Sequence, residues 1–157
     1  GHRRENHGIG FESICRALKR IAEDDRNRII IYPVHLNPNV QKPVYELLQN
    51  HKNIHLIEPL DYLPFVYLMS KSYLVLTDSG GLQKEAYFFK KKSLILREET
   101  EWGEILDNKA AILFKSNEGS LIQAYEKVLK LSPNFKDIYG DGKAGEFICN
   151  EILELLK

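Results

Sequence analysis

Apolar residues repeat at helical spacing near both ends of the chain. Residues 10–24 and residues 145–156 each carry an apolar stripe at intervals of three and four, which predicts two amphipathic helices. In the first helix the stripe is Phe11, Ile14, Cys15, Leu18, Ile21 and Ala22, and in the last it is Phe147, Ile148, Ile152, Leu155 and Leu156.

Short apolar runs alternate with helical segments between these two ends. The runs predict strands at residues 29–32, 54–57, 73–77 and 93–96, with a weaker strand at 111–114. Helices are expected around Val40 to Leu48 and over residues 62–70, 82–89 and 120–131. This alternation predicts an α/β fold: a Rossmann-like parallel sheet with helices on both faces. No repeat or linker divides the chain, so one domain is expected.

The first residues are unusual for such a fold. Residues 1–8 form a polar segment that leads directly into a helix, whereas in a doubly wound fold such a loop follows a strand. We therefore expect residues 1–157 to be one part of a larger architecture, with the first strand and an N-terminal partner domain absent.

Composition narrows the classes of function. Lysine plus arginine and aspartate plus glutamate both number 22 in 157 residues, so the chain lacks the basic excess of a sequence-independent nucleic-acid binder. No apolar run reaches the roughly 20 residues that span a bilayer, and no signal-peptide pattern opens the chain. A cytoplasmic protein that binds neither nucleic acid nor membrane is expected. Cys15 and Cys149 lie on apolar helix faces and are interpreted as reduced core residues.

One segment combines the features of a phosphate-binding turn. After the strongest predicted strand come Ser79, Gly80 and Gly81, and then a helix that carries Glu85. Glycines let backbone N–H groups approach a ligand, and the start of a helix favours an anion. A valine at position 81 would add strain if φ were positive there. The carboxylate of Glu85 could accept two hydrogen bonds from vicinal hydroxyls such as those of ribose. The alternative is a simple turn followed by a favourable acid in the first helical turn.

Two other loops carry candidate chemistry. Residues 1–8 hold two arginines, two histidines and a carboxylate, and His2 could donate a proton or a hydrogen bond to a phosphate oxygen. The alternative is a solvated charged loop. His35 follows a predicted strand end, either as a pocket residue or as a structural hydrogen-bonding residue. Residues 139–142, Tyr-Gly-Asp-Gly, predict a turn that taken alone indicates no function.

Four motifs together resemble one family. In order they are His-Arg-Arg-Glu-Asn at residues 2–6, Tyr-Pro-Val-His-Leu-Asn-Pro-Asn-Val at 32–40, Leu-Thr-Asp-Ser-Gly-Gly-Leu-Gln at 76–83 and Tyr-Gly-Asp-Gly at 139–142. With this spacing the chain looks like the C-terminal domain of bacterial non-hydrolysing UDP-N-acetylglucosamine 2-epimerases. The resemblance covers essentially the whole chain.

The resemblance implies one half of a glycosyltransferase-B-type fold, with UDP-sugar bound between the two halves. In that family UDP-GlcNAc and UDP-ManNAc interconvert by elimination and re-addition of UDP, without a cofactor or metal. The carboxylates that move protons lie in the N-terminal half, so this chain alone is expected to be inactive. A homodimer is left open.

The resemblance also assigns residues by motif position. His2 would contact the diphosphate and assist the chemistry, and Phe65 would lie near the uracil. The phosphates would be held by Ser79, Gly80 and Gly81, and the ribose by Glu85. Three residues match positions at which bacterial members bind a second UDP-GlcNAc as activator: His2, Arg3 and His35.

The chain departs from the family pattern at two places. Members usually read Gln-Glu-Glu-Ala-Pro after the glycines and Thr-Glu-Arg-Pro-Glu later, whereas this chain has Lys84 and Tyr87 in the first motif and Trp102 in the second. An indole supplies neither the charge nor the bidentate fork of a guanidinium. The departures are similar to relatives that act on UDP-2,3-diacetamido sugars and their uronic acids.

Several functions therefore remain open. The leading interpretation is the nucleotide-binding half of a UDP-N-acetylglucosamine 2-epimerase that serves cell-surface polysaccharide synthesis. Alternatives are an epimerase for UDP-2,3-diacetamido sugars or uronates, a glycosyltransferase donor domain, and a non-catalytic UDP-binding fragment. The motif at residues 2–6 argues against the glycosyltransferase.

Overall fold

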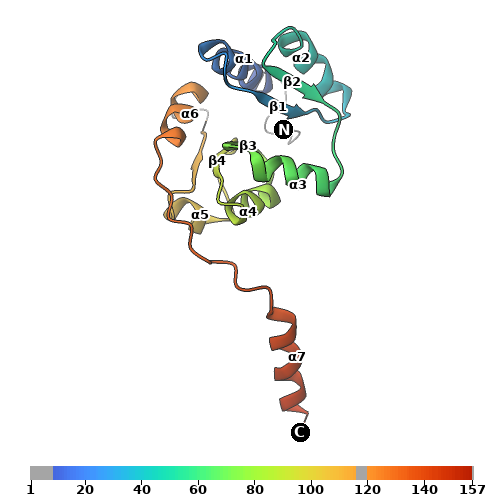
Figure 1. Cartoon of the computed structure of the whole chain (residues 1–157), viewed down its shortest axis with the longest axis vertical. Coiled ribbons are helices and arrows are strands. Elements are labelled where there is room, and N and C mark those ends of the chain that lie inside the picture. The colour runs from blue at the N-terminus through green and yellow to red at the C-terminus, as the bar shows by residue number, and fades with distance from the viewer. Residues whose placement is uncertain (1–8, 116–119, 157) are drawn as a thin grey trace.

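Helices and strands alternate along the chain as the sequence predicts. The structure is a computed structural model that describes residues 9–115 and 120–156 (Figure 1). Every predicted helix and strand is present within a few residues of its predicted bounds. The order is α1 (Ile9–Asp24), β1 (Ile30–Pro33), α2 (Pro38–Leu48), β2 (Ile54–Ile57), α3 (Tyr62–Lys71), β3 (Leu74–Thr77), α4 (Gly80–Phe88), β4 (Lys92–Ile95), α5 (Gly103–Asp107), β5 (Ala111–Leu113), α6 (Leu121–Leu129) and α7 (Ala144–Leu155).

Among the described helices, α5 is the one that the pattern of apolar positions does not predict. It has five residues, which is too few to show a helical period in the pattern of apolar positions. Its one fully buried side chain, Ile105, packs in the cluster beneath α4.

All strand pairs are parallel, but the strands form two sheets. One sheet contains β1 and β2, and the other has the order β3-β4-β5. The parallel pairing confirms the predicted α/β class. The division into two sheets differs from the single sheet that the sequence predicts.

Helices cover both faces of the three-stranded sheet. Consecutive residues of a strand point to opposite faces, and in β4 these are Leu94 and Ile95, both fully buried. Leu94 belongs to a cluster with Val128 of α6, whereas Ile95 belongs to a second cluster with Tyr87 of α4. The layered arrangement of a Rossmann-like domain is thus present.

The larger cluster joins the two sheets into one interior. Its buried members come mainly from α1, α2 and α6, and its partly buried members include Tyr32 of β1, Leu56 of β2 and Leu76 of β3. The two sheets therefore share a core although no hydrogen-bonded ladder connects them.

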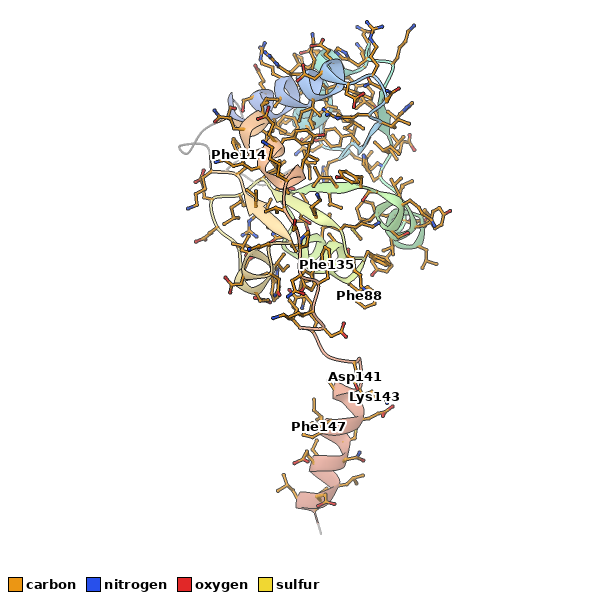
Figure 2. All side chains as sticks on the ribbon, turned by 60° about the vertical axis from the view of Figure 1, so that its left-hand side comes forward. Phe88, Phe114, Phe135, Asp141, Lys143 and Phe147 are labelled. Carbon is orange, nitrogen blue, oxygen red and sulfur yellow. The ribbon has the colours of Figure 1, made fainter. Side chains whose placement is uncertain are left out.

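Helix α7 lies apart from this core. Figure 1 shows it at the end of an extended segment that leads away from the other helices, and Figure 2 shows Phe147 on it, far from Phe88 and Phe135. None of its residues is buried. The expectation that Cys149 is a core residue is therefore wrong, because its helix has no packing partner among the described residues; Cys15 is buried as expected. No described helix is both long and apolar enough to cross a membrane.

Candidate anion-binding site

The turn after β3 leads directly into the start of α4. Ser79 is the N-cap residue with extended backbone (φ −86°, ψ 131°), and its side chain makes no capping hydrogen bond. Its own N–H donates to Oγ1 of Thr77 at 3.0 Å, which orients the turn. The first-turn N–H groups of a helix have no partner inside the helix, and they carry its positive dipole end. An anion at this position would meet these donors together with the Ser79 hydroxyl.

The two glycines that begin α4 have different surroundings. A Cβ on Gly80 would meet the side chains of Glu101, Arg97 and Trp102 at 3.5, 3.7 and 3.9 Å. A Cβ on Gly81 would meet no atom of the described residues within 4 Å. Packing among the described residues therefore does not require glycine at position 81. The backbone at Gly81 is thus not covered by the described residues.

Backbone strain does not explain Gly81 either. The described glycines with positive φ are Gly140 (78°) and Gly142 (84°), in the turn before α7. Gly81 lies in regular helix, so the strain expected of valine at position 81 under a positive φ is absent. A larger side chain at this position would obstruct a ligand without straining the fold.

Glu85 lies on the same face of α4 as Gly81. Residues four apart on a helix are neighbours on one face, and both lie in α4. Glu85 is half-buried, one turn beyond the glycine. A ligand whose phosphate reaches the start of α4 could therefore bring its next polar groups to this carboxylate.

The opposite side of the α4 start rests on the segment after β4. Arg97 is buried and forms a bidentate ion pair with Glu101, both nitrogen–oxygen distances being 2.8 Å. The buried amide of Gln83 donates to the carbonyl of Ser79 at 3.3 Å and accepts from the hydroxyl of Thr100. The Arg97–Glu101 pair is charge-assisted and fixes the segment after β4, and the neutral hydrogen bonds of Gln83 link this segment to the carbonyl of Ser79. Residues 97–101 thus support the Ser79 turn from behind.

Trp102 completes this support. Its indole Nε1–H donates to the carbonyl of Gly80 at 2.9 Å. The ammonium of Lys84 lies 4.4 Å from the Trp102 ring centroid and 4.8 Å from that of Tyr139. The family resemblance leads one to expect a glutamate and an arginine at positions 84 and 102. The structure instead pairs a cation with an aromatic ring, so the two departures from the family pattern are in contact with each other.

The third departure, Tyr87, also has a structural role. Its hydroxyl donates to the carbonyl of Lys136 at 3.1 Å and accepts from the N–H of the same residue at 3.0 Å. Its ring meets Phe135 and Tyr139 edge-on, at 5.3 and 5.8 Å between centroids. Burial, followed by the nearby carboxylate of Glu104, raises the pKa of Tyr139. The segment before α7 is thus held against α4. No local sequence pattern predicts this contact.

The other residues expected in the site lie on different elements. His35 is exposed in the loop after β1, and its Nδ1 accepts a hydrogen bond from the N–H of Asn37 at 3.1 Å. Phe65 is half-buried in α3. His2 and Arg3 lie outside the described residues. Within those residues no group of three histidine, cysteine, aspartate or glutamate side chains is placed to bind a metal.

The parallel strands, the helices on both faces and the open start of α4 define the class of the protein. It is a Rossmann-like domain of the kind that forms one half of a glycosyltransferase-B fold, which the solved structures below share. The family profile described as UDP-N-acetylglucosamine 2-epimerase matches residues 1–153, and the chain belongs to this family.

Individual relatives agree with this assignment. The chain is 46% identical to a UDP-N-acetylglucosamine 2-epimerase of Campylobacter jejuni and 45% identical to one of Yersinia pestis, over 98% and 100% of its length. Among solved structures, it is similar to the Neisseria meningitidis UDP-GlcNAc 2-epimerase bound to UDP-GlcNAc (TM-score 0.82, 40% identity, 98% of this chain and 43% of that one). It is also similar to the S. aureus MnaA–UDP co-structure (TM-score 0.87, 36% identity, 99% and 44%). The chain spans about 42% of the length of the curated relatives.

Proposed function

We propose that this chain is the C-terminal nucleotide-binding domain of a UDP-N-acetylglucosamine 2-epimerase. In the full-length protein it would pair with an N-terminal domain and interconvert UDP-GlcNAc and UDP-ManNAc. The observation that carries the proposal is the start of α4: the Ser79 side chain makes no capping bond, and the Gly81 side is open. Relatives that share 43–46% identity with the chain carry this activity in their names.

The proposed contacts follow from the geometry of α4. The diphosphate would accept hydrogen bonds from the first-turn N–H groups and from the hydroxyl of Ser79, on the side where Gly81 leaves room. The ribose hydroxyls would then donate to Glu85, one turn further along the same face. Phe65 would contact the uracil, which has a flat apolar surface suited to an aromatic ring.

Roles for His2, Arg3 and His35 belong to the same proposal. His2 would contact the diphosphate and assist proton movement, and the three residues together would bind a second UDP-GlcNAc as activator. An imidazole and a guanidinium are suitable donors to phosphate oxygens. We place the reaction in the cytoplasm, in the synthesis of cell-surface polysaccharide, which suits a chain whose two cysteines are both free.

Substitution of Glu85 tests the ribose contact. In the full-length protein Glu85→Gln should weaken UDP binding by roughly ten- to a hundredfold, because a hydrogen bond to a charged group is worth about 1.5–3 kcal/mol. Calorimetric titration with UDP measures the change. Glu146→Gln is the matched control: Glu146 lies in the first turn of α7 and should leave the affinity unchanged.

An assay of product formation, run beside the UDP titration, separates catalysis from binding. Purified residues 1–157 should form no UDP-ManNAc, because the proton-moving carboxylates are expected in the partner domain. Equal UDP affinity in the wild type and in Glu85→Gln would refute the ribose assignment. Product formed by residues 1–157 above a Glu85→Ala control would refute the need for a partner domain.

A second candidate substrate is favoured by one observation. Lys84 stacks on Trp102 directly behind the Gly80 carbonyl, where the family pattern has an acid and an arginine. This exchange is similar to relatives that act on UDP-2,3-diacetamido sugars or their uronic acids. A substrate panel on the full-length protein distinguishes the two: turnover of UDP-GlcNAc supports the first candidate, and turnover of the diacetamido sugar alone supports the second.

A further inference from the structure

Lysines gather at the end of the three-stranded sheet that lies opposite the Ser79 turn. Strands β3, β4 and β5 are parallel, so the turns that lead into them meet at one edge of the sheet, the amino edge. These turns are residues 72–73, 89–91 and 108–110. We call the lysines in and beside them the lysine edge: Lys71, Lys90, Lys91, Lys92, Lys109 and Lys130.

A hydrogen bond places the end of α6 at the same edge. The ammonium of Lys92, the first residue of β4, donates to the carbonyl of Leu129 at 2.7 Å. Leu129 is the last residue of α6, so Lys130 directly after it also lies beside the amino end of β4. The lysine edge therefore combines residues from four separate parts of the sequence.

The lysine edge carries charge of one sign. Residues 71–73, 88–92, 108–110 and 130–131 contain no aspartate or glutamate. Among the described residues, the six lysines form no ion pair with a carboxylate. The segment after β4, at the other end of the sheet, instead holds three exposed acids: Glu98, Glu99 and Glu101. The chain as a whole has a net charge of zero, so its charge is unevenly distributed.

Exposed aromatic rings accompany these lysines. Tyr67 is 67% exposed, Tyr73 71% and Phe88 75%. The ammonium of Lys71 lies 5.4 Å from the ring centroid of Tyr67, and that of Lys92 lies 5.2 Å from the ring centroid of Tyr73. Single exposed aromatic residues are ordinary, but several that share one edge with a group of cations mark an interaction surface.

The residue types indicate the chemistry of the partner. Protein interfaces are enriched in arginine and depleted in lysine, and the bidentate fork that reads carboxylates and phosphates also belongs to arginine. The six cations of this edge are all lysines. A surface of anionic lipid needs positive charge but no fork, and aromatic rings lie favourably at the level of its headgroups. Lysine stems can rest on apolar surface while the ammonium reaches the phosphates.

We propose that the lysine edge binds the surface of a membrane that contains anionic phospholipid. Phe88 and Tyr73 lie among the headgroups, and the lysine ammonium groups face the lipid phosphates. The Ser79 turn follows β3 at the carboxyl end of the sheet, so this orientation leaves it directed away from the membrane.

This contact differs from the expectation that the chain binds no membrane. That expectation rests on continuous apolar runs, which detect segments that cross a bilayer. The lysine edge is assembled from turns that are distant in the sequence, so no such run reveals it. The proposal does not depend on which nucleotide sugar binds.

Sedimentation of the full-length protein with vesicles tests the role of charge. The protein should sediment with vesicles of equimolar phosphatidylcholine and phosphatidylglycerol, and not with phosphatidylcholine alone. Lys90→Gln with Lys109→Gln should lower the partition coefficient at least tenfold, because each lysine near an anionic membrane contributes roughly fivefold. The matched control is Lys42→Gln with Lys143→Gln, in α2 and directly before α7. It removes the same charge from exposed positions elsewhere and should leave binding unchanged.

A second pair of variants tests the aromatic contribution. Phe88→Ser should weaken binding to the mixed vesicles roughly tenfold, because the ring leaves water when it enters the headgroup layer. Leu36→Ser is the control, since Leu36 is also exposed but lies in the loop after β1. The side chains changed in all of these variants are exposed, so the thermal unfolding midpoints should equal that of the wild type.

Other outcomes overturn the proposal. Absence of binding to the mixed vesicles shows that the lysine edge does not bind lipid, and equal binding to phosphatidylcholine alone shows that charge is not the cause. Equal losses in the Lys90–Lys109 and Lys42–Lys143 variants show that the edge has no special role. Binding to a duplex oligonucleotide but not to vesicles, lost in the Lys90–Lys109 variant, identifies nucleic acid as the partner instead. Added salt should release the protein from the vesicles, and retention in high salt contradicts an electrostatic contact.

Discussion

Helices α1 and α7 carry the same kind of apolar stripe and have opposite surroundings. In α1 the stripe is in the core, where Ile14 is 6% exposed. In α7 the matching residue type, Ile152, is 52% exposed, and no residue of the helix is buried. The pattern of apolar positions predicted both helices correctly and could not distinguish them.

The difference shows what an amphipathic pattern indicates about a helix. A stripe shows that a helix can bury one face, but a partner must supply the opposing surface. For α1 that surface comes from α2 and α6. For α7 the preceding turn, with its two positive-φ glycines, leads the chain away from the other helices (Figure 1).

The largest expected effect comes from matched truncations in the two helices. Ile14→Ala should lower the free energy of unfolding by about 2–5 kcal/mol, because it leaves a cavity in the core. Ile152→Ala should change it by less than about 0.5 kcal/mol, because the side chain is already in water. Urea denaturation measures both. A loss at Ile152 as large as that at Ile14 would show that α7 packs against the body in solution.

The next largest expected difference is in the alkylation rates of the two cysteines. Burial raises the pKa of the Cys15 thiol to about 11, from an ordinary value of 9.0. Alkylation proceeds through the thiolate, so this shift alone makes Cys15 about a hundredfold less reactive at neutral pH, and burial adds to this. Cys149 is exposed and should react first.

Iodoacetamide labelling followed by mass spectrometry measures both rates, and Cys149→Ser isolates Cys15. Comparable rates for the two thiols in the native protein would contradict their assigned surroundings. The raised pKa also has a consequence for stability. The unfolded chain releases the Cys15 proton more easily, so the free energy of unfolding should fall as pH rises from 9.0 to about 11.

The smallest expected effect is a coupling free energy between two residues. They lie at the boundary between the packed body and the segment that leads to α7. Lys84 lies between the rings of Trp102 and Tyr139 at this boundary. Trp102→Arg alone would place two cations together, whereas Lys84→Glu with Trp102→Arg would create an ion pair. A double-mutant cycle in urea should give a favourable coupling of about 0.5–2 kcal/mol.

The control for this cycle is Lys109→Glu, in the turn after α5, combined with Trp102→Arg. That pair should be additive within about 0.3–0.5 kcal/mol. Additivity of Lys84→Glu and Trp102→Arg as well would mean that the two departures from the family pattern arose independently.

Part of the candidate site was readable from local sequence. Ser79, Gly80, Gly81 and Glu85 lie within seven residues, so a strand, a turn and a helix suffice to place them. The sequence distinguishes Trp102 only as a departure from the family pattern. Its hydrogen bond to Gly80 spans 22 residues of sequence, and no local period encodes a contact of that kind.

The sequence by itself determined the order of helices and strands, the parallel α/β class and the family, because these follow from short-range periodicity and from motifs in a fixed order. The tertiary structure alone decided which apolar faces are buried, that a Cβ on Gly81 would meet no described atom within 4 Å, and that the ammonium of Lys84 lies on the ring of Trp102. These properties depend on contacts between segments that are distant in the sequence. Such contacts are set by the packing of the whole core.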